Sequence, residues 1–311
     1  MMQATVKNKI DFSHFTLQDK ALYEEYLSGD TERGCEFSFA NLYLWGRQSF
    51  ALLHGHVVLF SQFDRRSIYP YPVGNGDKKA VLDAIIADAK ERGIACRISG
   101  LGESAKKTLE QLYPNQFRFH CDEGSWDYVY DINDLADLGG KKYHGKRNHL
   151  NRFKDIVPHY TVEPIDEHNL PRVKEMAKNW YQTRLKENPD GDYHMEAAAL
   201  EKAFRDYRAL DMEGLVLLDG EEVLAFTMAS RLSEDTFDVH FEKARADIQG
   251  AYTAINCEFA NYIRDKYPSV RYLDREEDMG LEGLRKAKLS YYPHHMVKKC
   301  WAHLMEDGYD Y

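Results

Sequence analysis

The chain has 311 residues, of which 43% are hydrophobic and 30% charged, and its formal net charge is −10. This composition indicates a folded protein of about two domains and excludes a disordered chain. The acidic excess argues against general affinity for nucleic acid or anionic membranes, so any polyanion site must be local. The N-terminus lacks the apolar core of a secretory signal, and no apolar run is long enough to span a membrane. We therefore expect a cytoplasmic protein that is not integral to a membrane.

Five cysteines lie at wide spacings and form no CxxC pair. These spacings predict neither a disulfide framework nor a zinc site, and reduced, buried thiols are the favoured interpretation. The histidine pairs His54/His56 and His294/His295 lack a third ligand at a usual spacing, so no metal site is expected. The cysteines are Cys35, Cys96, Cys121, Cys257 and Cys300.

Helices and short strands alternate in the first half of the chain. Apolar spacing and glycine turns define them, with Gly55 in the turn of a predicted hairpin and Gly93 closing a predicted amphipathic helix. The predicted order is a helix over 16–27, a hairpin of 50–53 with 57–60, a strand at 67–71, a helix over 77–92, a strand at 94–98, a helix over 103–112 and a strand at 126–132.

The second half repeats this alternation. Asp219-Gly220 is a strong hairpin turn, and Phe237, Val239 and Phe241 alternate as in a strand. The predicted order is helices over 171–185 and 195–210, a hairpin of 215–218 with 223–228, a strand at 236–241, a helix that begins at Gly250, and a strand at 270–273. The repeated order indicates an internal duplication, with a mixed sheet in each half and a junction between residues 134 and 161.

A basic run lies at this junction. Residues 141–154 contain six Lys or Arg and no acidic residue, in a chain that is acidic overall. Such a run can be a solvated helix face. Its density and its mixture with Tyr, His and Asn favour an anion site for the phosphates of a nucleotide, CoA or a tRNA end. Lys146, Arg147 and Asn148 are its candidate binding residues.

A second candidate anion site lies between the strand at 236–241 and the following helix. It comprises Gln249, Gly250, Ala251 and Tyr252. A small-residue turn that opens a helix exposes free N–H groups, which can bind a phosphate. The same turn is equally compatible with an ordinary helix start.

The third candidate segment follows the last predicted strand, at the sheet edge where open α/β proteins bind ligands. Glu276, Glu277 and Asp278 could bind an ammonium group or act as a general base. Its basic residues Arg285 and Lys288 could hold an anion. Tyr291 could donate a proton. The alternative is a helix with acids at its start and bases at its end, which complements the helix dipole.

The order hairpin, strand, Gly-started helix and strand resembles the GNAT acyltransferase fold, with Gln249-Gly250-Ala251 at the position of its pyrophosphate loop. The segments 146–153 and 275–291 resemble the family named for the C-terminal domain of phosphatidylglycerol lysyltransferase, and the resemblance spans most of the chain. It implies an α/β (α+β) protein of two tandem GNAT-like domains, each a mixed sheet flanked by helices, similar also to the Fem peptidyltransferases. We expect these domains at 1–138 and 161–311, with a basic connecting segment at 139–160.

The resemblance also implies a bacterial transferase that moves an aminoacyl group from aminoacyl-tRNA to an amine or hydroxyl. The acceptor would be a lipid headgroup, a peptide or a small molecule. Aminoacyl-tRNA or acyl-CoA would be a co-substrate, and no permanently bound cofactor is expected. Two alternatives remain: a CoA-dependent N-acetyltransferase that uses the turn at 249–252, and a GNAT-fold module that binds a nucleotide or RNA end without turnover.

Overall fold

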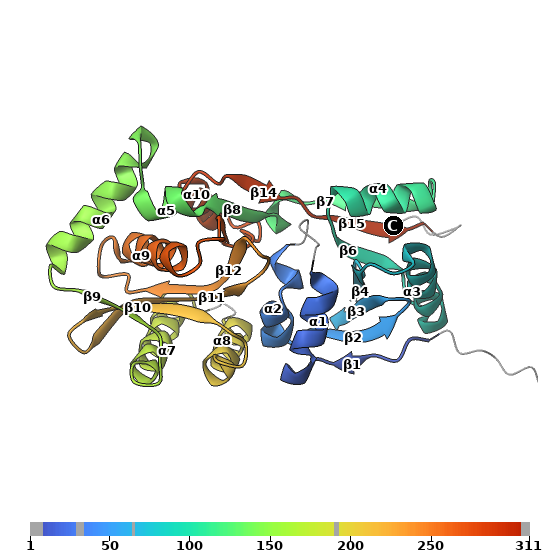
Figure 1. The fold of residues 1–311 in the computed structure, drawn as a ribbon, viewed down its shortest axis with the longest axis horizontal. Coiled ribbons are helices and arrows are strands. Elements are labelled where there is room, and N and C mark those ends of the chain that lie inside the picture. The colour runs from blue at the N-terminus through green and yellow to red at the C-terminus, as the bar shows by residue number, and fades with distance from the viewer. Residues whose placement is uncertain (1–8, 29–33, 64–65, 190–192, 306–311) are drawn as a thin grey trace, which may run out of the picture. The chain divides into compact units, whose positions relative to one another are not determined.

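The computed structural model describes residues 9–28, 34–63, 66–189 and 193–305. The chain divides into two compact units (Figure 1). Unit 1 comprises Met1–Trp126 with Val297–Tyr311, and unit 2 comprises Asp127–Met296. Within the described ranges, no helix is both long and apolar enough to cross a membrane.

Unit 1 is a mixed sheet with helices. Its strands are β1 (Ser13–His14), β2 (Gln48–Leu53), β3 (His56–Phe63), β4 (Arg66–Pro70), β5 (Val73–Gly74), β6 (Arg97–Leu101), β7 (Phe117–Cys121) and β15 (Cys300–Leu304). Its helices are α1 (Lys20–Leu27), α2 (Phe39–Trp45), α3 (Lys78–Arg92) and α4 (Glu103–Leu112). The strand order is β1-β2-β3-β4-β6-β15-β7, with β5 beside β3, and β4 and β6 are parallel.

Local sequence signals explain the bounds of several unit 1 elements. Asp77 caps α3 by accepting a hydrogen bond from the Ala80 N–H, and Gly93 ends the helix in the left-handed conformation. The apolar stripe of α3, which includes Val81 and Ile85, is fully buried. The hairpin of β2 and β3 and the helix α4 lie where the sequence predicts them.

Unit 2 is a second mixed sheet with helices. Its strands are β8 (Asp127–Asp131), β9 (Thr161–Pro164), β10 (Glu213–Asp219), β11 (Glu222–Arg231), β12 (Thr236–Ala244), β13 (Tyr272–Asp274) and β14 (His295–Val297). Its helices are α5 (Ile132–Asp137), α6 (His144–Ile156), α7 (Leu170–Glu187), α8 (His194–Asp206), α9 (Ala251–Lys266) and α10 (Glu282–Leu289). The strand order is β14-β8-β13-β12-β11-β10-β9, and β12 and β13 are parallel.

The helices of unit 2 cover both faces of its sheet. Helix α9 packs on β10, β11 and β12, with α5 and α6 against it, whereas α7 packs on β11 and β12 from the other face (Figure 1). The core around α9 is apolar and includes Phe153, Phe237, Ile255 and Phe259, each 2% exposed or less. Each unit is therefore a mixed sheet flanked by helices, as the sequence predicts.

Two strands lie in a different sheet from the one expected. Strand β8 closes the first half in the sequence-based prediction, but it pairs with β13 of unit 2. Strand β15, which the sequence pattern does not predict and whose residues fall in the expected second domain, pairs with β6 and β7 of unit 1. The unit boundaries consequently lie at Trp126/Asp127 and Met296/Val297, which differ from the expected 138 and 161. Sequence patterning defines a strand but not its partner, because pairing is set by contacts distant in the chain.

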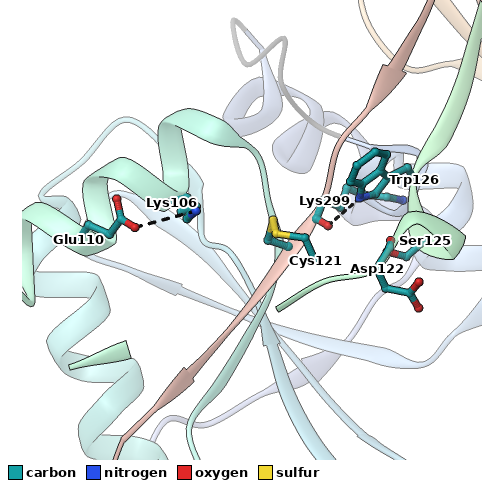
Figure 2. The surroundings of a disulfide bond; sticks show 8 residues. Lys106, Glu110, Cys121, Asp122, Ser125, Trp126 and Lys299 are labelled. Carbon is teal, nitrogen blue, oxygen red and sulfur yellow. Dashed lines mark hydrogen bonds and ion pairs between the residues drawn. A yellow bond between two sulfur atoms is a disulfide. The ribbon is translucent and has the colours of Figure 1, made fainter. Parts of the chain in front are cut away.

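The expectation that all cysteines are reduced is wrong for one pair. Cys121 on β7 and Cys300 on β15 form a disulfide at a sequence separation of 179 (Figure 2). These two residues are directly opposite each other in the antiparallel ladder, with a Cα–Cα distance of 4.2 Å. Only the register of β7 and β15 reveals this proximity, so wide spacing in sequence was a poor guide. Cys35, Cys96 and Cys257 are free and buried.

Candidate functional site

The sheet of unit 2 opens between its two parallel strands. Strands β12 and β13 pair from Thr236↔Tyr272 to Asp238↔Asp274 and no further. Beyond this point β12 continues along β11, whereas the chain after β13 follows β8 through backbone hydrogen bonds of Arg275 and Glu276 with Tyr128. Side chains from β12 and from the chain after β13 therefore lie near one another just beyond the end of the β12–β13 ladder.

A compact group of side chains lies on the α9 side of this opening, and we call it the Lys146 cluster: Lys146, Glu242, Asn256, Arg275 and Tyr291. Arg275 donates to Glu242 at 2.8 Å, and both side chains are mostly buried. The Lys146 ammonium lies 3.6 Å from the centroid of the Tyr291 ring, and the Arg275 guanidinium lies 5.2 Å from the same centroid. Tyr291 is thus a platform for two cations.

Several tyrosines and a threonine hold this platform in place. The Tyr291 hydroxyl lies 3.4 Å from Thr253 Oγ1 on α9, and its backbone carbonyl accepts a hydrogen bond from Tyr143 at 2.8 Å. Tyr130 packs edge-on against Tyr291 and donates to the carbonyl of Lys288. Because each partner comes from a different element, the ring position depends on the complete fold of unit 2.

Lys146 carries a positive charge that no described residue neutralises directly. Its ammonium makes no hydrogen bond or ion pair within the described part of the chain. Burial and the neighbouring Arg275 guanidinium lower the pKa of Lys146 to about 8, while the Glu242 carboxylate acts in the opposite direction. A partly buried ammonium in this position is suited to bind an anion or a developing negative charge.

Asn256 adds an unsatisfied polar atom to the same cluster. The residue is 3% exposed, and its Nδ2 donates weakly to Glu242 at 3.4 Å. Its Oδ1 is buried and has no hydrogen-bond partner among the described residues. A buried acceptor without a donor is costly, so this atom favours a ligand that brings an N–H or O–H group.

The three predicted carboxylates lie in different environments. Glu276 follows β13 and approaches His240 at 3.5 Å, and Glu277 is partly buried in the same loop. Asp278 is fully buried and accepts hydrogen bonds from Tyr128 at 2.6 Å, from Gly280 N–H at 2.8 Å and from Arg285. These bonds hold the pKa of Asp278 below its usual value despite its burial. Asp278 and Arg285 are therefore partners of each other.

Most of the other basic residues that were predicted to bind an anion donate hydrogen bonds to backbone carbonyl groups instead. Lys288 is 9% exposed, and its ammonium donates to the carbonyls of Arg275 and Glu276, at 3.2 Å for Glu276. Arg147 donates to the carbonyls of Leu138 and Gly140 at the end of α5. Asn148 is exposed and lies 3.5 Å from the ring of His144 one turn earlier. The structure brings Lys146 and Tyr291 together, but it does not bring Arg285, Arg147 or Asn148 to them.

The turn at 249–252 packs against α6. A Cβ on Gly250 would lie 2.1 Å from the His149 carbonyl oxygen, and the φ of Gly250 is +89°. Glycine is therefore required here by close packing and by backbone conformation. Gln249 is exposed, Ala251 is buried, and Tyr252 accepts a hydrogen bond from Trp180 at 3.1 Å. The α9 N-terminus is thus covered on one side by α6.

Sequence reasoning missed Glu242, Asn256 and Arg275 as members of the site. Arg275 directly precedes the three carboxylates of the third candidate segment. Glu242 is an acidic residue at the end of an apolar strand, and Asn256 interrupts the apolar face of α9. A polar residue within an otherwise apolar element was the available sequence signal for the site, because a buried polar group needs a hydrogen-bond or ion-pair partner.

Comparison with known proteins shows the family of this chain. Residues 31–303 match the family described as phosphatidylglycerol lysyltransferase, C-terminal. The chain belongs to this family. An uncharacterised protein of Mycoplasmoides gallisepticum is 24% identical over 181 residues, which cover 57% of this chain and 56% of that protein. The match thus spans about half the length of that relative.

Several solved structures share the fold of this chain. A conserved protein of unknown function from Bacteroides thetaiotaomicron is 36% identical, has a TM-score of 0.89, and is matched over 95% of this chain and 100% of that one. L-PGS from Bacillus licheniformis has a TM-score of 0.67 at 16% identity, with 92% of each chain covered. FemX has a TM-score of 0.58 at 13% identity, with 95% of this chain and 98% of that chain covered. Both distant structures share the fold with this member of the phosphatidylglycerol lysyltransferase C-terminal family.

Proposed function

We propose that this chain is an aminoacyltransferase that uses aminoacyl-tRNA as donor and an amine or hydroxyl as acceptor. The acceptor nitrogen or oxygen attacks the ester carbonyl carbon, and a new C–N or C–O bond forms. The ester bond to the terminal ribose breaks, and the proton of the acceptor passes to the ribose oxygen that leaves. This reaction requires orientation and stabilisation of the developing oxyanion.

The observation that carries the proposal is the partly buried ammonium of Lys146, which rests on Tyr291 without a counter-ion among the described residues. Its position beside the opening between β12 and β13 suits a terminal phosphate of the donor or the oxyanion of the reaction. Arg275 is already paired with Glu242, so Lys146 supplies the net positive charge of the cluster. Membership of the lysyltransferase family supports the same class of reaction.

Glu242 and Asn256 are suited to bind the amine group that takes part in the reaction. The Asn256 Oδ1 atom lacks a donor, and Glu242 contacts both Asn256 and Arg275. An acceptor amine, or the α-amino group of the aminoacyl donor, would supply the N–H that Asn256 lacks. In this proposal Lys146 and Arg275 hold negative charge, and Glu242 and Asn256 orient the amine.

The exposed side of α6 fits a polyanion that reaches Lys146. Lys141, Arg152 and Lys154 are exposed on or just before this helix, and Lys146 lies on the same helix at the cluster. Lys142 is also exposed but pairs with Asp134 at 2.8 Å. A tRNA end that follows this helix would bring its terminal ester to the Lys146 cluster.

The CoA-dependent alternative has less support. A pyrophosphate at the α9 N-terminus needs open space beside Gly250, and α6 lies against that residue. The close packing of α6 already explains why glycine is needed at position 250, so a bound phosphate is not needed to explain it.

The test is a donor comparison on the purified full chain, with mixed aminoacyl-tRNA, deacylated tRNA and acetyl-CoA. We expect aminoacyl-tRNA to bind, with affinity that falls steeply as salt rises. Transfer of labelled amino acid is then measured to phosphatidylglycerol vesicles, to lysine peptides and to small amines. The Lys146→Met variant should lose about 10- to 100-fold in donor affinity or transfer, as expected for one bond to a charged group.

The matched control is Lys90→Met, which removes an exposed lysine from α3 in unit 1. This variant should bind and transfer like the wild type. Stabilisation by acetyl-CoA without tRNA binding would favour the acetyltransferase instead. Tight tRNA binding without transfer to any acceptor would favour a binding module.

A further inference from the structure

A second polar group lies at the same opening of the sheet. It comprises Asp238 and His240 of β12 and Glu276 after β13. Asp238 alternates with Phe237 and Val239, which pack in the α9 core, so its carboxyl lies on the other face of the sheet. The register of β11 and β12 shifts between Met228↔Phe241 and Ala229↔Val239, so His240 is the extra residue of a β-bulge.

Three ligand-type atoms converge in this group. The His240 Nδ1 atom lies 3.4 Å from Asp238 Oδ2 and 3.5 Å from Glu276 Oε1. The exposed fractions of the His240, Asp238 and Glu276 side chains are 1%, 0% and 23%. Neither His240 Nδ1 nor Glu276 Oε1 has a hydrogen-bond partner among the described residues, although both are buried. These contacts are therefore close approaches without hydrogen-bond geometry.

The other ring nitrogen of His240 is occupied. His240 Nε2 lies 2.8 Å from Ser230 Oγ on β11, and both residues are buried. When Nε2–H donates to the Ser230 hydroxyl, Nδ1 carries a lone pair directed at two carboxylate oxygens. Three electron-rich atoms at this separation repel one another, and a cation between them would relieve this repulsion.

We propose that Asp238, His240 and Glu276 bind a divalent first-row metal ion such as Zn²⁺ or Mn²⁺. Metal bonds of about 2.0–2.1 Å in a tetrahedron place neighbouring ligand atoms about 3.3–3.4 Å apart. The two observed separations, 3.4 Å and 3.5 Å, match this spacing. An imidazole ligand selects a first-row metal over Ca²⁺ or Mg²⁺, which favour all-oxygen sites. The Ser230 hydroxyl fixes the imidazole, as outer partners of metal-bound histidines usually do.

The surrounding backbone holds the third ligand in position. Glu276 has a left-handed φ of +59°, and its N–H donates to Asp274 Oδ1 at 2.8 Å. The carbonyl of Glu276 accepts hydrogen bonds from Lys288 and from the Tyr128 N–H. Three protein ligands leave a fourth position on the metal for water or a substrate atom, and the more exposed Glu276 marks the side of entry. Two of the ligands lie on β12 and the third follows β13, so no short spacing in the sequence predicts all three.

Metal binding is measured without any tRNA, so its outcome is independent of the proposed transfer activity. Untagged protein is stripped with a chelator, dialysed and titrated calorimetrically with Zn²⁺, Mn²⁺ and Mg²⁺. We expect one site for Zn²⁺ or Mn²⁺ and no comparable binding of Mg²⁺. Ser230→Ala should weaken binding about 10- to 100-fold, as the loss of an outer partner does. Glu276→Gln should weaken it at least as much.

Glu282→Gln is the matched control, because Glu282 lies six positions later, is 80% exposed and pairs only with Lys286 in the described structure. It should bind the metal like the wild type. The absorption spectrum of the Co²⁺ form should show nitrogen and oxygen ligands without thiolate charge transfer. The proposal is overturned if no stoichiometric binding occurs, if Glu276→Gln binds normally, or if thiolates are the ligands.

Discussion

The Lys146 ammonium lies over the face of the Tyr291 ring, 3.6 Å from its centroid. A ring face attracts a cation without neutralising it, and the attraction is about 0.5–2 kcal/mol. An ion pair in the same place would have neutralised the charge of the Lys146 ammonium. Tyr291 therefore keeps a partly buried ammonium available for a ligand, while its own hydroxyl is directed to Thr253.

This arrangement predicts that the ring of Tyr291 matters more than its hydroxyl. Tyr291→Phe keeps the platform, so transfer should stay within about threefold of the wild type, whereas a general acid would be worth about 10²- to 10⁴-fold. Tyr291→Leu removes the ring face and should weaken donor binding about three- to thirtyfold, the equivalent of the cation–π attraction. The measurement is donor affinity and single-turnover transfer for each variant. A large loss in Tyr291→Phe would restore the acid role that the sequence suggests.

The lowered pKa of Lys146 predicts a pH dependence in two quantities. The protonated ammonium binds anions, so donor affinity should fall as pH rises through about 8. Stability should change in the opposite direction. The folded state lowers this pKa from 10.5, so the unfolded chain binds more protons between about 8 and 10.5, and this lysine makes the folded state more stable as pH rises there.

The check is the difference in unfolding free energy between wild type and Lys146→Met, measured across this pH range. The variant should be at least as stable as the wild type at pH 7, and its advantage should shrink as pH approaches 10.5. A difference that is independent of pH would mean that Lys146 titrates as an ordinary surface lysine.

We predict that Asp278 stabilises the fold and takes no direct part in transfer. Its carboxylate accepts from Tyr128, Gly280 and Arg285, so Asp278→Ala leaves several groups without a partner and should cost about 1.5–3 kcal/mol of stability. Glu282→Ala removes only an exposed pair with Lys286 and should change stability by a few tenths of a kcal/mol. Chemical unfolding measures both. If Asp278→Ala folds normally yet abolishes transfer, the carboxylate is catalytic after all.

Gly250 and Gly220 allow packing to be separated from backbone strain. Both have positive φ, +89° and +56°, but only Gly250 lies against α6. Gly220→Ala should cost about 1–3 kcal/mol through its left-handed conformation alone. Gly250→Ala adds a contact of 2.1 Å with the His149 carbonyl and should be clearly more destabilising. Equal losses would show that α6 moves freely away from the turn, and that the turn can open for a phosphate.

The sequence predicted local structure well and long-range placement poorly. The hairpin turn at Gly220 and the helix over 103–112 depend on patterns within a few residues, and the structure contains them. Strand β8 has an ordinary strand pattern, but its partner β13 lies far away in the chain, and the partners of β15 are equally distant. The partnership of Glu242 with Arg275 depends in the same way on where two strands separate, and no local pattern encodes that point.

The disulfide gives the sharpest test of this long-range placement. Cys121 and Cys300 face each other only if β15 returns to the sheet of unit 1 beside β7. A crosslink that spans 179 positions restricts the unfolded chain strongly, and native disulfides typically contribute about 2–4 kcal/mol. Cys300→Ser should therefore unfold at a lower denaturant concentration than the oxidised wild type.

Reductant provides the control, because it should lower the stability of the wild type to that of Cys300→Ser and leave the variant unchanged. Peptide mapping without reduction should recover Cys121 linked to Cys300, with Cys35, Cys96 and Cys257 as free thiols. Cys121 is exposed on β7, so reductant can reach the bond without global unfolding. If the wild type is insensitive to reductant and no linked peptide is recovered, the two cysteines are reduced. Hydrogen bonds to β6 and β7 then hold β15 without a covalent link.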